Sequence, residues 1–366
     1  MLTQLRIPSF PAIHSEDVIL NLSKDASIPA GKWKQIINGN EFMWVAAWKD
    51  KISGKMKYVW PSEGSHLRQK KEREKYDRAM SIEENIDKIR KYISEGMKSK
   101  DEKMRKVATV CYIIDRLVMR VGDEKDEDEA DTVGASTLRV EHVKFHPDMI
   151  EFDFLGKDSV KWEKDVKISD VDPAFVKNIK EFMQGKRAAD LIFNVDSSEV
   201  NKFLGGCIKG LTAKVFRTYH ATKTLVSYLK HVKVKPSDDT QKKMYYAKMG
   251  NLEVAVACNH KKTPPKTWEQ AFARKQERLQ KLLQTKPKTE KQAEKLKERI
   301  AKLKLDIELA KKTKEWNLNT SLKSYIDPRA YRAWLDKMGL DWTKLYTASL
   351  QKKFSWADRA KIKWED

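Results

Sequence analysis

The chain has 366 residues, 40% of them hydrophobic, so it is long enough for two or three domains with a sizeable core. Lys and Arg number 74 against 53 Asp and Glu, which leaves a formal net charge of +21 at pH 7. This composition excludes a disordered tail and indicates a polyanionic partner, with nucleic acid as the first candidate and an anionic membrane surface as the second. A surplus of lysine that serves only solubility is less favoured at so large an excess.

Three features bear on the cellular compartment. No apolar run approaches the roughly 20 residues of a membrane span, and the start MLTQLRIPSF lacks the apolar centre of a signal peptide. Cys111, Cys207 and Cys258 are far apart and lie among apolar neighbours, which is typical of buried thiols rather than of a disulfide scaffold or a zinc site. We therefore expect a soluble, intracellular protein.

The first part of the chain changes from a strand pattern to a helix pattern. Residues 18–60 alternate apolar and polar side chains in short bursts separated by turn residues, which predicts a small β-region. From about residue 82 the apolar period is helical, first at Ile86, Ile89 and Tyr92 and then at Val107, Val110, Ile113, Ile114, Leu117 and Val118. The second of these helices is predicted to be largely buried.

The middle of the chain contains short strands followed by helices. The acidic stretch 123–131 lacks the Gly and Glu spacing of a calcium loop, so a solvated turn is the favoured interpretation. Strands are predicted at 137–144, 149–154 and 159–162. Helices are predicted from about 173 to 258, with breaks near Gly185, at 205–207 and at 234–236.

Past Pro264 and Pro265 the composition shifts to Lys, Glu, Gln, Leu and Ala. A heptad seam recurs at Ala293, Leu296, Ile300, Leu303, Ile307 and Ala310, and a looser stripe precedes it at Trp268, Phe272, Leu279 and Leu282. An antiparallel helical hairpin fits both halves, and its basic outer faces fit a solvated coiled coil as well as a DNA contact. Further helices are predicted to open at Asp327-Pro328, at Asp341 and at Trp356-Ala357.

Six local strings share the order that they have in one enzyme family. They are IIDRLVMRV at 113–121, DTVGASTLRVEHV at 131–143, EFDFLGKDS at 151–159, LTAKVFRTY at 211–219, VACNHKKTPPKTW at 256–268 and SYIDP at 324–328. Together they resemble the eukaryotic-type IB DNA topoisomerases, over residues 16–360. The resemblance implies relaxation of supercoiled DNA through cleavage and religation of one strand.

The resemblance implies a catalytic set of five residues: Arg120, Lys157, Arg217, His260 and Tyr325. The chemistry is consistent with these residue types. Two guanidinium groups and a histidine can bind the non-bridging oxygens of a phosphodiester. A tyrosine must lose its proton to attack, and surrounding positive charge favours the phenolate. The product is a 3′-phosphotyrosine.

The 5′ oxygen is a poor leaving group until it is protonated, and Lys157 in the turn LGKDS matches the general acid of the family. Religation reverses the reaction, and because the ester bond energy is kept, neither ATP nor a metal is required. The sequence has no GxxxxGK[ST] loop and no convincing carboxylate cluster for magnesium. The resemblance further implies DNA contacts by Lys157, Asp158, Lys214, Asn259, Lys261 and Ser324.

Each catalytic residue has a structural alternative when taken alone. Arg120 could pair with Glu124, Lys157 could be a turn lysine and Arg217 could bind a carboxylate. His260 could cap a helix, and Tyr325 could be an amphipathic residue at a helix start. Five matches in their family context outweigh these alternatives.

Two other functions compete with topoisomerase activity. Tyrosine recombinases use a similar constellation, but they usually carry H-x-x-R around the second arginine, where this chain has Lys214-Val-Phe-Arg217 and a long linker before Tyr325. The other competitor is a catalytically weakened DNA-binding fragment or scaffold, against which the five retained positions argue.

Two departures from the family pattern affect DNA and inhibitor binding. Residues 16–28 look like the end of an N-terminal lobe that closes over DNA in the family, so we expect weaker and more salt-sensitive binding than for a full clamp. Ser324 stands where eukaryotic members usually have Asn, so planar inhibitors of the camptothecin type are expected to stabilise the cleaved complex poorly.

The predicted fold is α+β and mainly helical, with a tyrosine recombinase/type IB topoisomerase-like catalytic core and a coiled-coil linker. The expected divisions are the end of the DNA-clamp lobe at 1–40, the catalytic core at 41–265, the helical-hairpin linker at 266–316 and a C-terminal domain with the nucleophile at 317–366. We expect a monomer on duplex DNA, preferentially supercoiled, with no membrane, and a chromosome-associated location in a nucleus or nucleoid.

Overall fold

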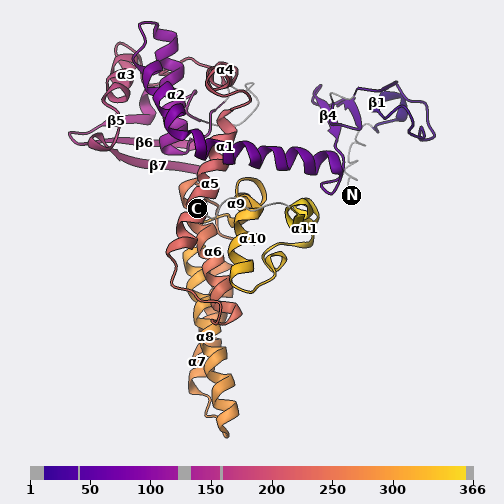
Figure 1. The fold of residues 1–366 in the computed structure, drawn as a ribbon, viewed down its shortest axis with the longest axis vertical. Helices are drawn as coiled ribbons and strands as arrows, with labels where there is room; N and C mark the ends of the chain where they lie inside the picture. Colours follow the sequence, from indigo (N-terminus) through magenta and orange to yellow (C-terminus); the bar gives the residue numbers. More distant parts are fainter. Residues whose placement is uncertain (1–11, 40–41, 123–132, 157–159, 360–366) are drawn as a thin grey trace, which may run out of the picture. The chain divides into compact units, whose positions relative to one another are not determined.

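The computed structural model describes residues 12–39, 42–122, 133–156 and 160–359, and over these residues the fold is α+β and mainly helical, as predicted (Figure 1). The chain divides into two compact units, which are described separately. The first comprises Met1–Arg73 with Gln351–Trp356, and the second comprises Glu74–Leu350 with Ala357–Asp366. The predicted catalytic residues belong to the second unit.

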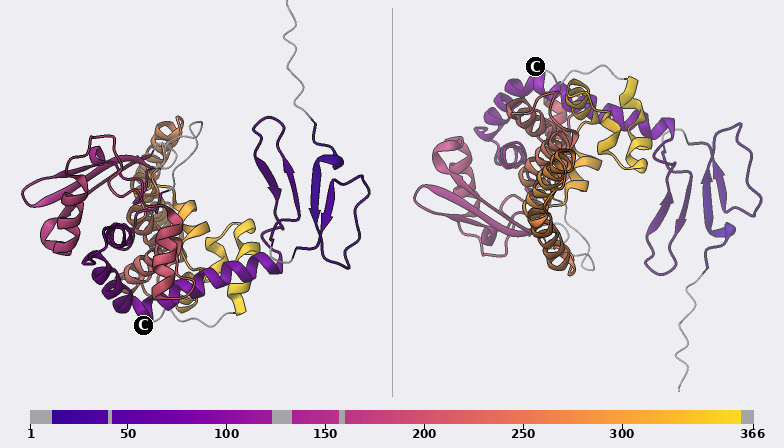
Figure 2. Two further views of the ribbon diagram at one scale, coloured as in Figure 1. Left: turned by 90° about the horizontal axis from the view of Figure 1, so that it is seen from above. Right: turned by 90° about the horizontal axis from the view of Figure 1, so that it is seen from below.

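The first unit is built on a sheet of four strands, which lie side by side in Figure 2. The strands are β1 (Val18–Asn21), β2 (Gln35–Ile37), β3 (Ala46–Lys49) and β4 (Met56–Val59), in the order β2-β1-β3-β4. β1 is parallel to β2, whereas β3 is antiparallel to both β1 and β4. Val18 and Leu20 are buried and the residues between and after them less so, as the alternation predicts. The β-region predicted at 18–60 is confirmed.

Helices α1 (His66–Met97) and α2 (Glu102–Leu117) follow the sheet. The helix predicted from about residue 82 begins much earlier, at His66. Its first turns are rich in Lys, Arg, Glu and Gln, which favour helix but give little apolar periodicity. α2 matches the predicted apolar stripe and is largely buried, and it ends at Val118 in the left-handed conformation, with φ 54°.

The second unit has a three-stranded antiparallel sheet of β5 (Val143–Phe145), β6 (Met149–Gly156) and β7 (Val160–Lys167), in the order β5-β6-β7. The strand predicted at 137–144 is mostly wrong, because Val140 and Glu141 donate their backbone N–H groups to the carbonyls of Asp190 and Ala188 instead of to a neighbouring strand. The acidic stretch 123–131 lies outside the described residues.

Four helices come next: α3 (Pro173–Met183), α4 (Ser197–Cys207), α5 (Ala213–His231) and α6 (Thr240–Ala257). The predicted breaks separate them, except that Gly205 and Gly206 lie inside α4. A Cβ on Gly206 would lie 3.2 Å from the hydroxyl of Tyr92, so a larger residue there requires Tyr92 to shift. α5 is the central helix, since it packs against α2, α4, α6 and α10.

Helices α7 (Trp268–Gln284) and α8 (Glu290–Lys312) run side by side (Figure 1). Every residue of the seam predicted in α8 is buried or half-buried, and Leu303 is the most buried of them. At one end of α8, Leu305 and Leu309 pack on a cluster of Tyr245, Met249 and Leu252 in α6. The hairpin is therefore joined to the rest of the second unit through an apolar base.

The C-terminal part contains α9 (Leu318–Ser324), α10 (Pro328–Lys337) and α11 (Ala348–Lys353). Asp327 caps α10 by accepting from the N–H of Arg329, so this predicted start is confirmed. The starts predicted at Asp341 and Trp356 lead only to short 3₁₀ turns, at Trp342–Leu345 and Ser355–Arg359. The sequence does not predict α9 or α11, which are too short to show a helical period.

Two of the three cysteines are as predicted. Cys111 and Cys258 are buried, but the prediction is wrong for Cys207, which is half-buried at the end of α4. Desolvation still raises the pKa of the Cys207 thiol. Among the described residues, no helix has both the length and the apolar character that a membrane span needs.

Candidate active site around Tyr325

Arg217 lies on the buried face of α5 and is only 4% exposed. Its Nη1 donates to the carbonyl of Val118 at 2.5 Å, and its Nη2 donates to the carbonyl of Cys258 at 3.0 Å. Val118 and Cys258 are the C-cap residues of α2 and α6, where carbonyls lack intrahelical donors and the helix dipole favours a cation. The two helix ends therefore fix the guanidinium and offset part of the cost of burying it.

The Nε atom of Arg217 is buried and has no hydrogen-bond partner among the described residues. A buried donor without an acceptor costs about 1–3 kcal/mol, and more when it is charged. This arrangement is suited to an acceptor from outside the chain, and the oxygens of a phosphate match the geometry of a guanidinium. The sequence also allowed Arg217 to bind a carboxylate, but its Nη1 and Nη2 donate to backbone carbonyls instead.

Arg120 is half-buried and lines the same small cavity, of about 30 Å³, as Arg217 and Asn259. Its backbone carbonyl accepts from the N–H of Ala135 at 2.8 Å, so a second segment of chain holds it in place. The pairing of Arg120 with Glu124 that the sequence allows lies outside the described residues.

Two glycines let the segments that carry Arg120 and Ala135 approach closely. Gly122 has a φ of +85°, which favours glycine. A Cβ on Gly134 would lie 2.4 Å from the backbone N of Gly122, closer than any side chain allows. Glycine at both positions is thus a condition for the placement of Arg120.

His260 follows α6 and is 4% exposed. Its Nδ1 lies 2.7 Å from Oγ of Ser321, and its Nε2 lies 3.3 Å from Nη2 of Arg217. Desolvation, followed by the charges of Arg217 and Arg120, lowers the pKa of His260 to about 3. The imidazole is therefore neutral near pH 7 and carries a single N–H.

The position of that proton follows from the partners of the ring. Arg217 only donates, so its bond requires Nε2 as the acceptor and places the proton of His260 on Nδ1, facing Ser321. The sequence predicts that His260 donates to a phosphate, and donation from Nε2 needs the other tautomer. In that tautomer the hydroxyl of Ser321 donates to Nδ1.

The burial of neutral His260 gives a testable dependence of stability on pH. The unfolded side chain takes up a proton near its ordinary pKa of 6.5, whereas the folded one does so only near 3. The stability that His260 contributes is therefore present above pH 6.5 and is lost as the pH falls toward 3. We expect this residue to account for a loss of about 2–3 kcal/mol in unfolding free energy between pH 7 and 4.5.

Urea unfolding of the wild type and His260→Gln at pH 7 and pH 4.5 measures this pH-dependent loss of unfolding free energy. The wild type should lose more stability than His260→Gln by that amount. His231→Gln, which changes an exposed histidine at the end of α5, is the matched control and should keep the wild-type loss. Equal losses in all three proteins would contradict the assignment.

Tyr325 is the C-cap residue of α9, and its backbone N–H donates to the carbonyl of Ser321 at 3.0 Å. Its half-buried ring has its centroid 5.2 Å from that of His260 and 5.1 Å from Cζ of Arg217. Tyr325 therefore lies at the end of one helix. The alternative interpretation of the sequence, which placed it at the start of a helix, is wrong. The contact between ring and guanidinium is a favourable cation–π interaction.

The remaining predicted site residues comprise two that the structure does not describe and four that it does. Lys157 and Asp158 lie outside the described residues, between β6 and β7. Lys214 is exposed one turn before Arg217, and Lys261 and Ser324 are half-buried. The side chain of Asn259 donates to the carbonyl of Lys161 at 3.1 Å, from a backbone with φ +50°.

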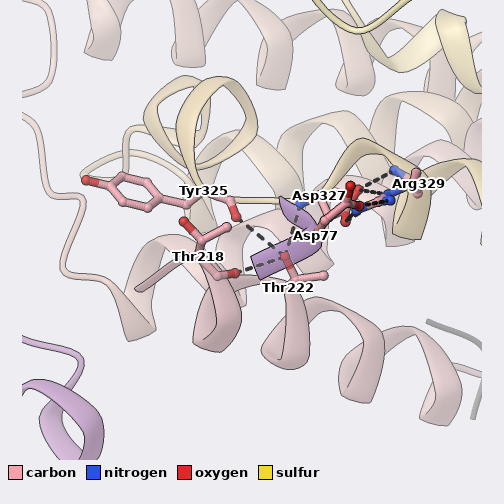
Figure 3. Close-up of polar contacts among 6 residues, drawn as sticks. All are labelled: Asp77, Thr218, Thr222, Tyr325, Asp327 and Arg329. Carbon is pink, nitrogen blue, oxygen red and sulfur yellow. Dashed lines mark hydrogen bonds and ion pairs between the residues drawn. The ribbon is translucent and has the colours of Figure 1, made fainter. Parts of the chain in front are cut away.

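A cluster beyond Tyr325, which sequence reasoning missed, holds the backbone of this segment (Figure 3). Thr222 Oγ1 accepts from the N–H of Asp327 at 3.0 Å. Arg329 binds both carboxylate oxygens of Asp327 and reaches Asp77 of α1. The ring of Tyr325 points away from this cluster in Figure 3, so the cluster positions the residue without contacting its hydroxyl. The acid–arginine spacing Asp327-x-Arg329 was the only signal in the sequence.

Comparison with known proteins gives the family. Residues 64–298 match the catalytic core of eukaryotic DNA topoisomerase I, which is more than half of the chain. The chain belongs to the eukaryotic DNA topoisomerase I family. Residues 11–61 match the DNA binding fragment of eukaryotic DNA topoisomerase I, and residues 297–366 match the C-terminal topoisomerase domain. The resemblance seen in the sequence is thereby confirmed.

Curated relatives from animals and a plant support the same family membership. DNA topoisomerase 1 of Homo sapiens is 36% identical over 386 residues, DNA topoisomerase 1 alpha of Arabidopsis thaliana is 37% identical over 383, and DNA topoisomerase 1 of Drosophila melanogaster is 35% identical over 367. Each alignment covers 94% of this chain but only 50%, 41% and 37% of the relative. The chain spans about half the length, or less, of these relatives.

Proposed function

We propose that this chain relaxes supercoiled duplex DNA by cutting one strand with Tyr325 and resealing it, without ATP or a metal. The observation that carries the proposal is the placement of Arg217. Its buried guanidinium has an unpartnered Nε, lies beside the ring of Tyr325, and is fixed by two helix ends. A phosphodiester bound to that donor would lie next to the phenol.

The proposed reaction has one bond-forming and one bond-breaking step. The phenol of Tyr325 loses its proton to water, and the phenolate oxygen attacks the phosphorus. The bond from phosphorus to the 5′ oxygen breaks, giving a 3′-phosphotyrosine. Arg217 and Arg120 bind the non-bridging oxygens, and His260 donates from Nε2 in its neutral form. Lys157 protonates the leaving 5′ oxygen. Religation is the reverse, with the 5′ hydroxyl attacking the phosphotyrosine.

The wider setting of the enzyme is part of the proposal. We assign a tyrosine recombinase-like catalytic fold to the region 41–265, and a coiled-coil linker to 266–316 between it and the C-terminal domain at 317–366. The residues at 1–40 form the end of the DNA clamp. Lys214, Asn259, Lys261 and Ser324 contact DNA together with Lys157 and Asp158, and the protein acts as a monomer on chromosomal DNA, in the nucleus if the cell has one.

The test is relaxation of a supercoiled plasmid in EDTA without ATP, beside a Tyr325→Phe variant. The wild type should relax the plasmid and form a covalent adduct with it, and Tyr325→Phe should do neither, because its ring lacks the attacking oxygen. A folded wild type that forms no adduct would point to a DNA-binding scaffold. An adduct without relaxation would point to an incomplete DNA clamp or to a recombinase.

A further inference from the structure

Helix α1 contacts the segment around Tyr325 on both sides of that residue. Before it, Lys75 Nζ donates to the backbone carbonyl of Ser324 at 3.1 Å. After it, Asp77 Oδ1 accepts from Nη1 of Arg329 at 2.6 Å. The nucleophile proposed above is therefore bracketed by two side chains of one long helix.

The contact at Asp77 continues to the backbone next to Tyr325 through buried groups. Arg329 is 2% exposed as a residue and Asp327 is fully buried. Nη2 of Arg329 donates to Oδ2 of Asp327 at 2.7 Å, and the backbone N–H of Asp327 donates to Thr222 of α5 at 3.0 Å. Figure 3 shows these contacts, which lead from Asp77 through Arg329 to Asp327 and on to Thr222.

The hydroxyl of Thr222 has one proton and two acceptors near it. The carbonyl of Thr218 lies at 3.0 Å and that of Tyr325 at 3.4 Å, so the proton is directed mainly to Thr218. Thr222 thus gives only a weak hold on the carbonyl of Tyr325 itself. Stronger restraints act on Ser324, directly before Tyr325, and on Asp327, two residues after it.

The helix that ends at Tyr325 cannot by itself hold the backbone of this residue in one position. α9 has only seven residues, and an isolated helix of that length is not stable in water. Its packing and its anchors must therefore determine where the phenol lies. Attack on phosphorus is sensitive to that position, since a misplacement of about 1 Å costs up to about 10²-fold in rate.

We propose that Lys75 and Asp77 are positioning residues for the reaction, and that they fix the backbone on both sides of Tyr325 so that its phenol is presented to the phosphate. The inference rests on the proposed function of Tyr325. Neither residue touches the reacting atoms in this assignment. Their contribution is made through Ser324 on one side and through Arg329 and Asp327 on the other.

Single-turnover cleavage tests the proposal. The substrate is a duplex oligonucleotide whose cleaved 5′-hydroxyl strand is short enough to dissociate, so that the covalent adduct accumulates. At saturating DNA, Asp77→Asn and Lys75→Met should each lower the rate constant of adduct formation about 10-fold at unchanged final yield. Asp77→Glu should restore most of the rate, and the affinity of Asp77→Asn for DNA should not fall.

The final yield separates positioning from folding, because a partly unfolded variant gives less adduct at the normal rate. Glu83→Gln is the matched control. Glu83 also lies on α1, but the hydrogen bonds and the ion pair described for it lead to Lys223 and Tyr219 of α5 and not to the segment around Tyr325. This variant should react at the wild-type rate.

Two results would overturn the positioning role while leaving the proposed function in place. The first is an Asp77→Asn protein that forms the adduct as fast as a reactive wild type. The second is an Asp77→Asn defect that is not specific to the rate of that variant, either because only the final yield falls or because Glu83→Gln loses as much rate. If the wild type itself forms no adduct, the proposed function is overturned and this inference falls with it.

Discussion

Arg217→Lys is expected to lower the rate constant of covalent adduct formation by roughly 10²–10³-fold. Lysine keeps the positive charge but has a single ammonium group. In the wild type, separate nitrogens of Arg217 bond the carbonyls of Val118 and Cys258, and Nε remains for a phosphate. One ammonium cannot occupy these positions at once, so it either leaves a helix end unsatisfied or loses the phosphate.

The measurement is the same single-turnover cleavage, with the melting temperature recorded for each protein. Arg187→Lys is the matched control, because Arg187 is exposed and pairs only locally with Asp190 in the described contacts. It should cleave at the wild-type rate. A folded Arg217→Lys protein within threefold of the wild-type rate would show that the fork geometry of Arg217 is not needed.

The sequence predicts best those elements that are buried on one face over many residues. α2 is an example. Its apolar stripe is long and its two faces differ strongly in polarity, so the helical period can be recognised in the sequence alone. The first half of α1 lacks such a stripe, because charged helix formers cover most of its surface. The short helices α9 and α11 are held by tertiary contacts, which a local pattern does not record.

The candidate site shows the same limit at the level of side chains. The residue types at 217, 260 and 325 follow from the motifs, and the structure brings these three together. The neutral state of His260 does not follow, because it arises from burial and from two arginines that are distant in the sequence. The contacts of Ser321 and Asp77 are likewise invisible, since each joins residues that are far apart along the chain.

Burial of a charged cluster also determines how costly a change next to Tyr325 will be. Asp327→Ala should destabilise the protein by about 3–5 kcal/mol, because it leaves Arg329 buried without its main partner. Arg329 has a side chain only 3% exposed, and it donates to both oxygens of Asp327 at 2.7–3.1 Å. The contact of Arg329 with Asp77 is retained in this variant, but Asp77 is 43% exposed and compensates only in part.

Asp341→Ala provides the comparison that isolates the buried charge. Asp341 also accepts from a backbone N–H two residues on, at 2.9 Å, but it is exposed and its partner is Thr343 rather than an arginine. Its loss should cost only about 1 kcal/mol, the usual value for a cap. Urea unfolding of both variants measures the difference. If the two losses were equal, Asp327 would act as a helix cap alone, and the pair with Arg329 would contribute nothing to holding the segment of Tyr325.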